Sequence, residues 1–216
     1  MSDSPVQRFY RLHACVYDAT RWIVLHGRRQ AVEQLRLRPD SRVLEVGCGT
    51  GLNFRHILEH LDPACGRLVG LDFSPHMLVR ARRRVATQKW SHVELREGDA
   101  TRLRLDEPFD AVLFAYSLSM IADWRAALET ARDHLQQGGR IVVLDFSTFD
   151  GWGPAAAIAR AWLGLHHVRP DRSHVDAIRG AFADVEVRHF LRKYCFIAAG
   201  TKARTQGAAT DAGASV

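Results

Sequence analysis

The segment VLEVGCGTG, residues 43–51, carries the residue types best suited to bind a small ligand. Gly47, Gly49 and Gly51 directly follow a short apolar run. Because glycine has no side chain, a ligand can lie against the main chain there, and the turn can adopt positive φ angles. Such a loop at the carboxyl end of a buried strand is typical of proteins that bind nucleotide-type ligands.

Two ligand classes compete for this loop. The dinucleotide fingerprint G-x-G-x-x-G has its third glycine one position later, where this chain has Leu52. Glu45, which precedes the first glycine by two residues, would also bring negative charge toward a pyrophosphate. A ligand with a cationic end therefore suits the loop better than a dinucleotide.

The pattern E-x-G-x-G-x-G at Glu45 and the acids that follow it resemble the motifs of class I S-adenosylmethionine-dependent methyltransferases. The likeness covers residues 40–147, with Asp72 in GLDFSPHML and Asp99 in EGDA as the later acids. It implies that the glycine turn holds the methionine and ribose parts of the cofactor, with Glu45 at its ammonium end and Asp72 at its ribose hydroxyls. Asp99 and the main chain of Ala100 would hold the adenine. The resemblance implies S-adenosylmethionine as cofactor, S-adenosylhomocysteine as product and a Rossmann-like fold.

The same resemblance implies cofactor-binding residues in several segments of the chain. They are Glu45, Gly47, Cys48, Gly49, Thr50, Gly51, Asp72, Phe73, Met77, Asp99, Ala100 and Ser117. A magnesium ligand set of the catechol O-methylating type is not found in the sequence, so no metal is expected. The chain also lacks the Asn/Asp-Pro-Pro-Tyr sequence of the amino-methylating nucleic-acid enzymes, which argues against nucleic acid as a partner.

The elements that must position these residues follow the pattern of repeated βα units. Short apolar runs alternate with helical patterns, which predicts a mainly parallel sheet with helices on both faces. Seven strands are predicted, at residues 42–47, 67–73, 92–99, 109–117, 140–147, 184–191 and 194–201. Too few residues separate the last two strands for a crossover helix, so they should form an antiparallel hairpin. The predicted fold is an α/β, seven-stranded, mostly parallel sheet with an antiparallel C-terminal hairpin.

Apolar residues at three-to-four spacing predict amphipathic helices over residues 75–88 and 123–139. The second ends in the pair Gly138 and Gly139, which suits a left-handed helix cap. Residues 5–37 are expected to form two further helical stretches.

The chain is expected to divide into three parts. An N-terminal helical segment at residues 1–38 would act as a lid or face the membrane, and its first helix either lies in a bilayer interface or packs on the core. The methyltransferase domain would span residues 39–202 and include a substrate-side insertion at 147–181. Residues 203–216 are small and polar, which predicts a disordered tail.

The chain has 216 residues, 47% apolar and 25% charged, which fits one compact globular domain. Its longest mostly apolar stretch has about a dozen residues, against roughly 20 needed to span a bilayer. The N-terminus lacks the unbroken apolar core of a secretory signal, so a cytoplasmic protein is predicted. The cysteines are far apart and without a CxxC pair, which predicts buried apolar residues rather than a zinc site or disulfides. They are Cys15, Cys48, Cys65 and Cys195.

The net charge is +6, and the basic side consists of 27 Arg and 3 Lys. Such an excess favours anions, which include nucleic acid, an acidic membrane surface and an anionic substrate. Charge alone does not choose among these partners.

Residues 8–29 and the run AYSLSMIADW, residues 115–124, resemble bacterial enzymes that N-methylate lipid headgroups. These are the diacylglyceryl-homoserine N-methyltransferases of betaine-lipid synthesis and the phosphatidylethanolamine N-methyltransferases. The resemblance implies a lipid-headgroup amine as acceptor and peripheral association with the inner face of an anionic membrane. The catalytic or positioning residues proposed on this basis are Tyr17, Tyr116 and His13, and the substrate-binding residues are Asp18, Arg21 and Arg28.

Other functions stay open at this point. A methyltransferase of a small soluble metabolite, either an amine or a quinone-type ring carbon, would share every cofactor residue and differ only in the acceptor pocket. A non-catalytic cofactor-binding protein or a nucleic-acid-associated protein is a further alternative. The sequence leaves the oligomeric state undetermined.

Overall fold

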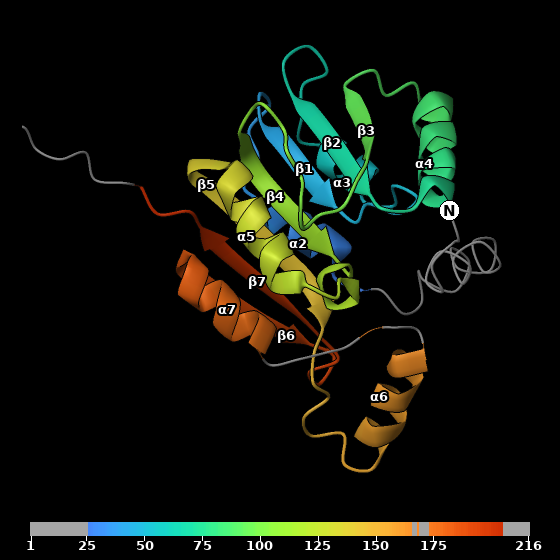
Figure 1. The fold of residues 1–216 in the computed structure, drawn as a ribbon, viewed down its shortest axis with the longest axis vertical. Coiled ribbons are helices and arrows are strands. Elements are labelled where there is room, and N and C mark those ends of the chain that lie inside the picture. The colour runs from blue at the N-terminus through green and yellow to red at the C-terminus, as the bar shows by residue number, and fades with distance from the viewer. Residues whose placement is uncertain (1–25, 166–167, 169–172, 205–216) are drawn as a thin grey trace, which may run out of the picture.

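The computed structural model describes residues 26–165, 168 and 173–204. In these ranges seven strands form one sheet in the order β3-β2-β1-β4-β5-β7-β6 (Figure 1). The strands are β1 (Arg42–Val46), β2 (Arg67–Asp72), β3 (Val93–Glu97), β4 (Phe109–Ala115), β5 (Leu135–Phe146), β6 (Ala183–Phe190) and β7 (Cys195–Thr201). The first five strands pair in parallel, whereas β7 runs antiparallel to both β5 and β6. The predicted sheet and its closing hairpin are confirmed.

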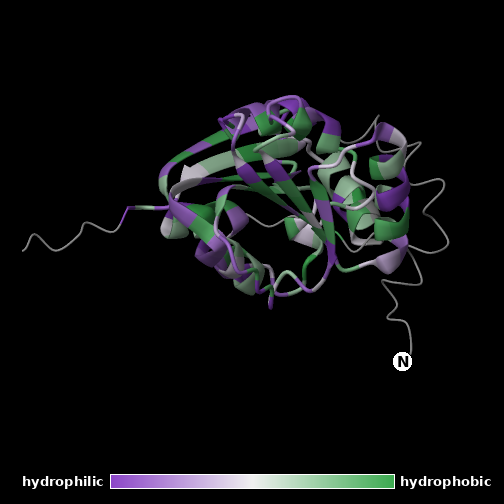
Figure 2. Ribbon diagram, turned by 90° about the horizontal axis from the view of Figure 1, so that it is seen from above, coloured by the Kyte–Doolittle hydropathy of each residue, from purple (hydrophilic) through white to green (hydrophobic). Residues whose placement is uncertain are grey.

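Both faces of the sheet are covered, and the apolar side chains of each strand divide between two cores. Adjacent residues such as Val112 and Leu113 in β4 belong to different cores, because successive side chains of a strand point to opposite faces. Figure 2 shows hydrophobic residues along the strands and residues of both kinds on the surrounding helices. The helices are α2 (Arg28–Gln34), α3 (Phe54–Leu58), α4 (Pro75–Gln88), α5 (Trp124–His134), α6 (Ala155–Leu165) and α7 (Ser173–Ala181), with a 3-10 helix η1 (Leu118–Met120).

Helices α2, α3, α4 and α6 contribute to one core, and α5 and α7 to the other. In α2, Ala31 and Val32 are fully buried against the sheet, so this part of the predicted N-terminal lid belongs to the domain itself. In α7, Ile178 is buried, and the rings of His174 and Trp124 are nearly perpendicular with centroids 4.5 Å apart. Residues 173–181 of the predicted insertion therefore also pack on the sheet layer, whereas α6 lies beyond the end of the sheet (Figure 1).

The helix predicted over residues 123–139 is wrong in its last part. Helix α5 ends at His134, and Leu135 opens β5 by pairing with Phe109. Gly138 has a positive φ of 79° but caps no helix, since its N–H donates to the Lys202 carbonyl at 3.0 Å. Main-chain pairing with β4 and with the chain after β7 satisfies these backbone groups, and this pairing outweighs the local helical pattern.

The prediction that all cysteines are buried is wrong for one of them. Cys48 and Cys195 are buried, whereas Cys65 is exposed. Cys65 lies in a turn between α3 and β2, where loops run over the surface. Cys15 lies outside the described residues, as do the helical stretch predicted before residue 26 and the tail from residue 205. No helix in the described part of the chain has the length and apolar character to cross a membrane.

Candidate functional site

The carboxyl ends of the parallel strands meet at one edge of the sheet, and the glycine loop lies there. The loop follows β1 directly, and Gly49 and Gly51 have positive φ angles of 57° and 75°. A Cβ atom on Gly51 would lie 2.5 Å from the Phe54 ring, so this position must be glycine for packing. A Cβ atom on Gly49 would meet nothing within 4 Å. The main chain at Gly49 thus borders open space that a ligand can fill.

Asp72, the last residue of β2, holds the glycine loop in place. Its Oδ2 accepts the Gly49 N–H at 2.7 Å, and its Oδ1 accepts the Ser74 N–H at 2.8 Å. Each oxygen of an ionised carboxylate can accept more than one hydrogen bond, which makes Asp72 a suitable acceptor for ligand hydroxyls. The next residue, Phe73, is 55% exposed. The end of β2 therefore offers an anchored carboxylate beside an exposed ring on which a flat ligand group can stack.

Glu45 is the most unusual group of the site, because it is a carboxyl in the middle of a buried strand. Its side chain is 1% exposed, and its Oε1 accepts the Asn53 Nδ2–H at 2.5 Å. Its Oε2 is buried and has no hydrogen-bond partner among the described residues. Burial raises the pKa of Glu45 to about 7, although the Asn53 hydrogen bond and the charge of Arg28 lower it. A buried carboxylate with one unpaired oxygen fits a cationic ligand group.

The end of β4 ties the loop to the neighbouring elements. Ser117 is buried, and its hydroxyl donates to the Val46 carbonyl at 2.6 Å. Tyr116 has a positive φ of 56°, is 2% exposed, and donates its hydroxyl to the His26 carbonyl at 2.7 Å. Burial raises the pKa of Tyr116 above its usual range, so the hydroxyl stays protonated. Tyr116 anchors the chain that leads into α2.

The remaining predicted cofactor residues lie around the same edge of the sheet. Asp99 is exposed after β3, where its Oδ1 accepts the N–H and the hydroxyl of Thr101 at 2.9 and 2.8 Å. Ala100 beside it is half-buried. Cys48 and Thr50 of the glycine loop and Met77 at the start of α4 are buried. Burial raises the pKa of the Cys48 thiol well above its usual value.

Of the predicted acceptor-side residues, the structure describes Tyr116 and Arg28. Arg28 donates from Nη1 to Asn53 Oδ1 at 2.6 Å, and its guanidinium carbon lies 5.8 Å from the centre of the Tyr116 ring. Four predictions lie outside the described residues and stay predictions. They concern His13, Tyr17, Asp18 and Arg21. In the described ranges no group of three or more His, Cys, Asp and Glu side chains is arranged to hold a metal ion.

Five aromatic side chains gather next to this edge, and sequence analysis missed most of them. We call them the aromatic cluster, and they are Tyr116, Phe146, Phe149, Trp152 and Tyr194. Ring centroids are 4.9 Å apart for Tyr116 and Phe146 and 5.6 Å apart for Phe146 and Tyr194. The antiparallel register, which pairs Phe146 with Cys195, brings the segments together. The sequence signal that could have indicated this cluster was the presence of aromatic residues at the end of β5 and just before β7.

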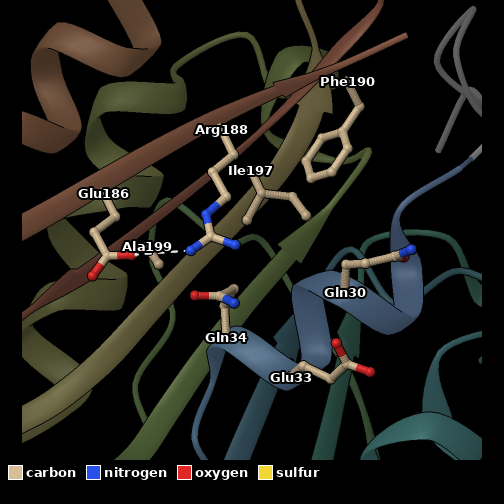
Figure 3. A pocket seen from close by; sticks show the side chains of 8 residues that line it. All are labelled: Gln30, Glu33, Gln34, Glu186, Arg188, Phe190, Ile197 and Ala199. Carbon is tan, nitrogen blue, oxygen red and sulfur yellow. Dashed lines mark ion pairs between the residues drawn. The ribbon is translucent and has the colours of Figure 1, made fainter.

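A separate hollow lies between α2 and the C-terminal hairpin (Figure 3). It is lined by Gln30, Glu33, Gln34, Glu186, Arg188, Phe190, Ile197 and Ala199. Figure 3 shows Arg188 reaching toward Glu186, with which it forms an ion pair at 3.8 Å. None of the predicted site residues lines this hollow.

Comparison with known proteins shows that the chain is similar to methyltransferases. A family model described as a methyltransferase domain matches residues 44–141. A demethylmenaquinone methyltransferase of Deinococcus radiodurans is 34% identical over 173 residues, which cover 76% of this chain and 68% of that protein. A demethylmenaquinone methyltransferase of Thermus thermophilus is 37% identical over 123 residues, covering 56% and 54%. The chain spans about half the length of several such relatives, with matches covering 51%, 54% and 53% of them.

A solved structure shows the same fold at low sequence identity. It is phosphoethanolamine N-methyltransferase 2 of Haemonchus contortus in complex with S-adenosyl-L-methionine. Its TM-score is 0.75 at 16% identity, and the match covers 94% of this chain and 61% of that one. At this identity the likeness concerns the fold alone.

Proposed function

The chain belongs to the class I S-adenosylmethionine-dependent methyltransferases, and from that premise we propose that it methylates a ring carbon of a reduced quinone-type acceptor. Its cofactor is S-adenosylmethionine. The aromatic cluster carries the proposal, because its partly buried members Trp152 and Tyr194 can stack on a planar ring. The other members, Tyr116, Phe146 and Phe149, are themselves buried. The names of the demethylmenaquinone methyltransferases among the relatives support the same acceptor class.

We assign the cofactor contacts to the residues around the glycine loop. When bound, S-adenosylmethionine supplies a methyl group carried on a positively charged sulfur, and transfer of the methyl group leaves that sulfur as the neutral thioether of S-adenosylhomocysteine. The open space at Gly49 would take the methionine and ribose parts, and Glu45 would face the ammonium group. Asp72 would accept the ribose hydroxyls, and Phe73 would stack on the adenine. This arrangement supports binding by hydrogen bonds and stacking without a metal ion.

On the acceptor side, the chain's part is to hold the ring and exclude water. A hydroquinone ring carbon becomes nucleophilic when a neighbouring hydroxyl loses its proton. Tyr116 is not suited to take this proton, because burial raises its pKa and keeps its hydroxyl protonated. Tyr17 and His13, which lie outside the described residues, stay the other predicted catalytic or positioning residues.

The lipid-headgroup amine is the weaker of the two acceptor proposals. The relatives are named for quinone methylation, and the likeness to the phosphoethanolamine enzyme concerns the fold alone. Peripheral association with an anionic membrane and a cytoplasmic location stay predictions. A panel of acceptors separates the proposals, with initial rates for a reduced short-chain naphthoquinone, phosphatidylethanolamine vesicles and a free amine. We expect turnover with the ring, and turnover with the vesicles alone would overturn the proposal.

Tyr194→Ala tests the acceptor side of the proposal. Tyr194 contacts three members of the aromatic cluster, so its removal should raise the KM for the ring acceptor by about five- to tenfold, or about 1 to 1.4 kcal/mol. The Kd for S-adenosylhomocysteine should stay within about twofold of the wild-type value. Leu191→Ala is the matched control, since Leu191 lies in the same turn and is 54% exposed. Equal KM values in the two variants would exclude the cluster from the acceptor site.

Asp72→Ala tests the cofactor side. The substitution leaves the Gly49 and Ser74 N–H groups without their acceptor and removes the proposed ribose contact. We expect S-adenosylhomocysteine to bind more weakly by about 1 to 3 kcal/mol in calorimetric titration. Asp62→Ala is the control, because Asp62 accepts the Ala64 N–H at 2.8 Å in an exposed turn. An unchanged affinity in Asp72→Ala would remove Asp72 from the site.

A further inference from the structure

A chain of polar side chains leads from α2 to the buried carboxyl of β1. Arg28 donates from Nη1 to Asn53 Oδ1 at 2.6 Å, and Asn53 donates from Nδ2 to Glu45 Oε1 at 2.5 Å. Asn53 and Glu45 are 2% and 1% exposed. The three residues come from different elements, separated by 25 and 8 positions along the sequence. Such a buried connection between distant segments constrains each of its members.

The donors and acceptors of this hydrogen-bonded series stand in a fixed order, from Arg28 through Asn53 to Glu45. A carboxamide can face a carboxylate with its NH₂ group, which donates, or with its oxygen, which is repelled. A guanidinium only donates hydrogen bonds, so Arg28 binds the amide oxygen of Asn53 and leaves the NH₂ group for Glu45. Without Arg28 the two orientations of the Asn53 amide would differ less in energy.

Arg28 is itself held by the acceptor side of the site. Its guanidinium carbon lies 5.8 Å from the centre of the Tyr116 ring, within the range of a cation–π contact. The Tyr116 hydroxyl donates to the carbonyl of His26, which lies just before Arg28. Tyr116 belongs to the aromatic cluster, so the side chains connect the proposed acceptor wall with Glu45.

We propose that Arg28 and Asn53 are positioning residues for the cofactor, in which Arg28 orients the Asn53 amide and Asn53 holds the Glu45 carboxylate toward the cofactor's ammonium group. The proposal rests on the cofactor role proposed for Glu45. It gives Arg28 a different task from the predicted substrate contact. It also explains why an arginine of α2 points into the domain, whereas its neighbour Arg29 has a side chain that is 74% exposed.

The charges around Glu45 act in the direction that this proposal requires. Burial raises the pKa of Glu45, the Asn53 hydrogen bond and the Arg28 charge lower it, and the Asp72 charge raises it. The Cys48 thiol is close enough for the Glu45 charge to act on its pKa, and burial keeps the thiol protonated. Arg28 and Asn53 thus both favour the ionised form of Glu45, and a cationic ligand needs that form.

The variant Arg28→Met tests the proposal, with Arg29→Met as the matched control. Arg29 lies on the same helix and pairs with Glu33 at 3.5 Å. Calorimetric titration with S-adenosylhomocysteine at pH 7 should show binding weakened about tenfold in Arg28→Met and changed less than about twofold in Arg29→Met. The loss should shrink at higher pH, where Glu45 ionises without help. Arg28→Lys keeps the charge and should recover part of the affinity.

A second readout does not depend on the cofactor. In ¹³C NMR titrations of the ligand-free protein, the Glu45 carboxyl should lose its proton at higher pH in Arg28→Met than in the wild type or in Arg29→Met. The signal is assigned by its absence in Glu45→Gln. Asn53→Asp places a second carboxyl against Glu45 and should shift the titration further in the same direction.

The outcomes separate this proposal from the proposed function. Identical titrations and affinities in Arg28→Met and Arg29→Met would overturn the positioning role, and Arg28→Lys supplies the same comparison if the methionine variant does not fold. A shifted Glu45 titration together with an unchanged affinity would also overturn it, because the carboxyl would then not face the cofactor. Failure of the wild type to bind S-adenosylhomocysteine would instead remove the cofactor role of Glu45.

Discussion

Glu45→Gln is expected to weaken S-adenosylhomocysteine binding about 10- to 100-fold at pH 8, as measured by calorimetric titration. Glutamine keeps the size of the side chain and an oxygen that can accept the Asn53 N–H, but it loses the negative charge. In the wild type the affinity should rise with pH up to about 7 and then level off, because burial raises the Glu45 pKa to about 7 and only the carboxylate pairs with an ammonium group. The variant should show no such rise.

The same substitution should improve stability at high pH relative to low pH. The pKa of Glu45 is about 7 in the folded protein against an ordinary value of 4.5, so the folded state binds more protons in this window and the wild type loses stability as pH rises through it. Glutamine does not titrate. Between pH 5 and pH 8, the unfolding free energy of Glu45→Gln minus that of the wild type should therefore increase by about 2 to 3 kcal/mol.

Glu59→Gln is the control for both measurements, because Glu59 is exposed at the end of α3. Its affinity should rise with pH as in the wild type, and its unfolding free energy should differ from that of the wild type by the same amount at both pH values. A Glu45→Gln protein that binds as tightly as the wild type would show that the buried carboxyl serves the fold and not the ligand. A constant stability difference between the two pH values would contradict the raised pKa.

Gly51→Ala and Gly49→Ala should differ in which property they impair: the first mainly lowers the free energy of unfolding, and the second mainly weakens cofactor binding. At Gly51 the new Cβ would lie 2.5 Å from the ring of Phe54, which is fully buried, and φ is 75°. Overpacking and a left-handed alanine together should lower the unfolding free energy by about 3 kcal/mol in urea denaturation. Gly49→Ala meets no neighbour within 4 Å, so it should lose only about 1 to 2 kcal/mol for its φ of 57°.

Gly49→Ala, the more stable of the two variants, should be the one whose cofactor binding is directly impaired. The Gly49 Cβ would enter the space proposed for the cofactor, so S-adenosylhomocysteine should bind at least about tenfold more weakly to a folded Gly49→Ala protein. A stable Gly49→Ala variant with wild-type affinity would mean that the cofactor does not lie against this turn. A Gly51→Ala variant as stable as the wild type would contradict the packing at Phe54.

Local sequence signals were sufficient for the elements whose ends are fixed locally. Helix α4 runs over residues 75–88 as predicted, because Ser74 caps it, Pro75 suits its first turn and its apolar stripe faces the sheet. The end of α5 could not be found this way. Leu135 continues the helical stripe of that segment, and only its pairing with Phe109 on a distant strand places it in β5.

The residues of the site likewise divide into those indicated by local sequence and those placed only by folding. Glu45 and Asp72 stand in a motif with fixed spacing, so the sequence alone points to them. Asn53 and Arg28 acquire their contacts through folding, and an arginine on a polar helix gives no signal that it turns inward. The aromatic cluster likewise depends on the register between β5 and β7.

The acceptor was harder to predict than the cofactor because the sequence resemblance that suggested it was short. Residues 8–29 and 115–124 suggested a lipid-headgroup amine, whereas the relatives are named for demethylmenaquinone. Most of the first segment lies outside the described residues. In the second, Tyr116 is buried and its hydroxyl proton is already donated to a carbonyl, so Tyr116 has no proton left to donate to an amine. The proposal therefore moves from nitrogen to ring carbon.

The position of the transferred methyl group tests the account most directly. S-adenosylmethionine with a ¹³C-labelled methyl group is incubated with the protein, a reduced short-chain demethylated naphthoquinone and phosphatidylethanolamine vesicles together, and the products are examined by ¹³C NMR. The account predicts label in a methyl group on an aromatic ring carbon. Label on nitrogen of the lipid headgroup, with none on the ring, would contradict it.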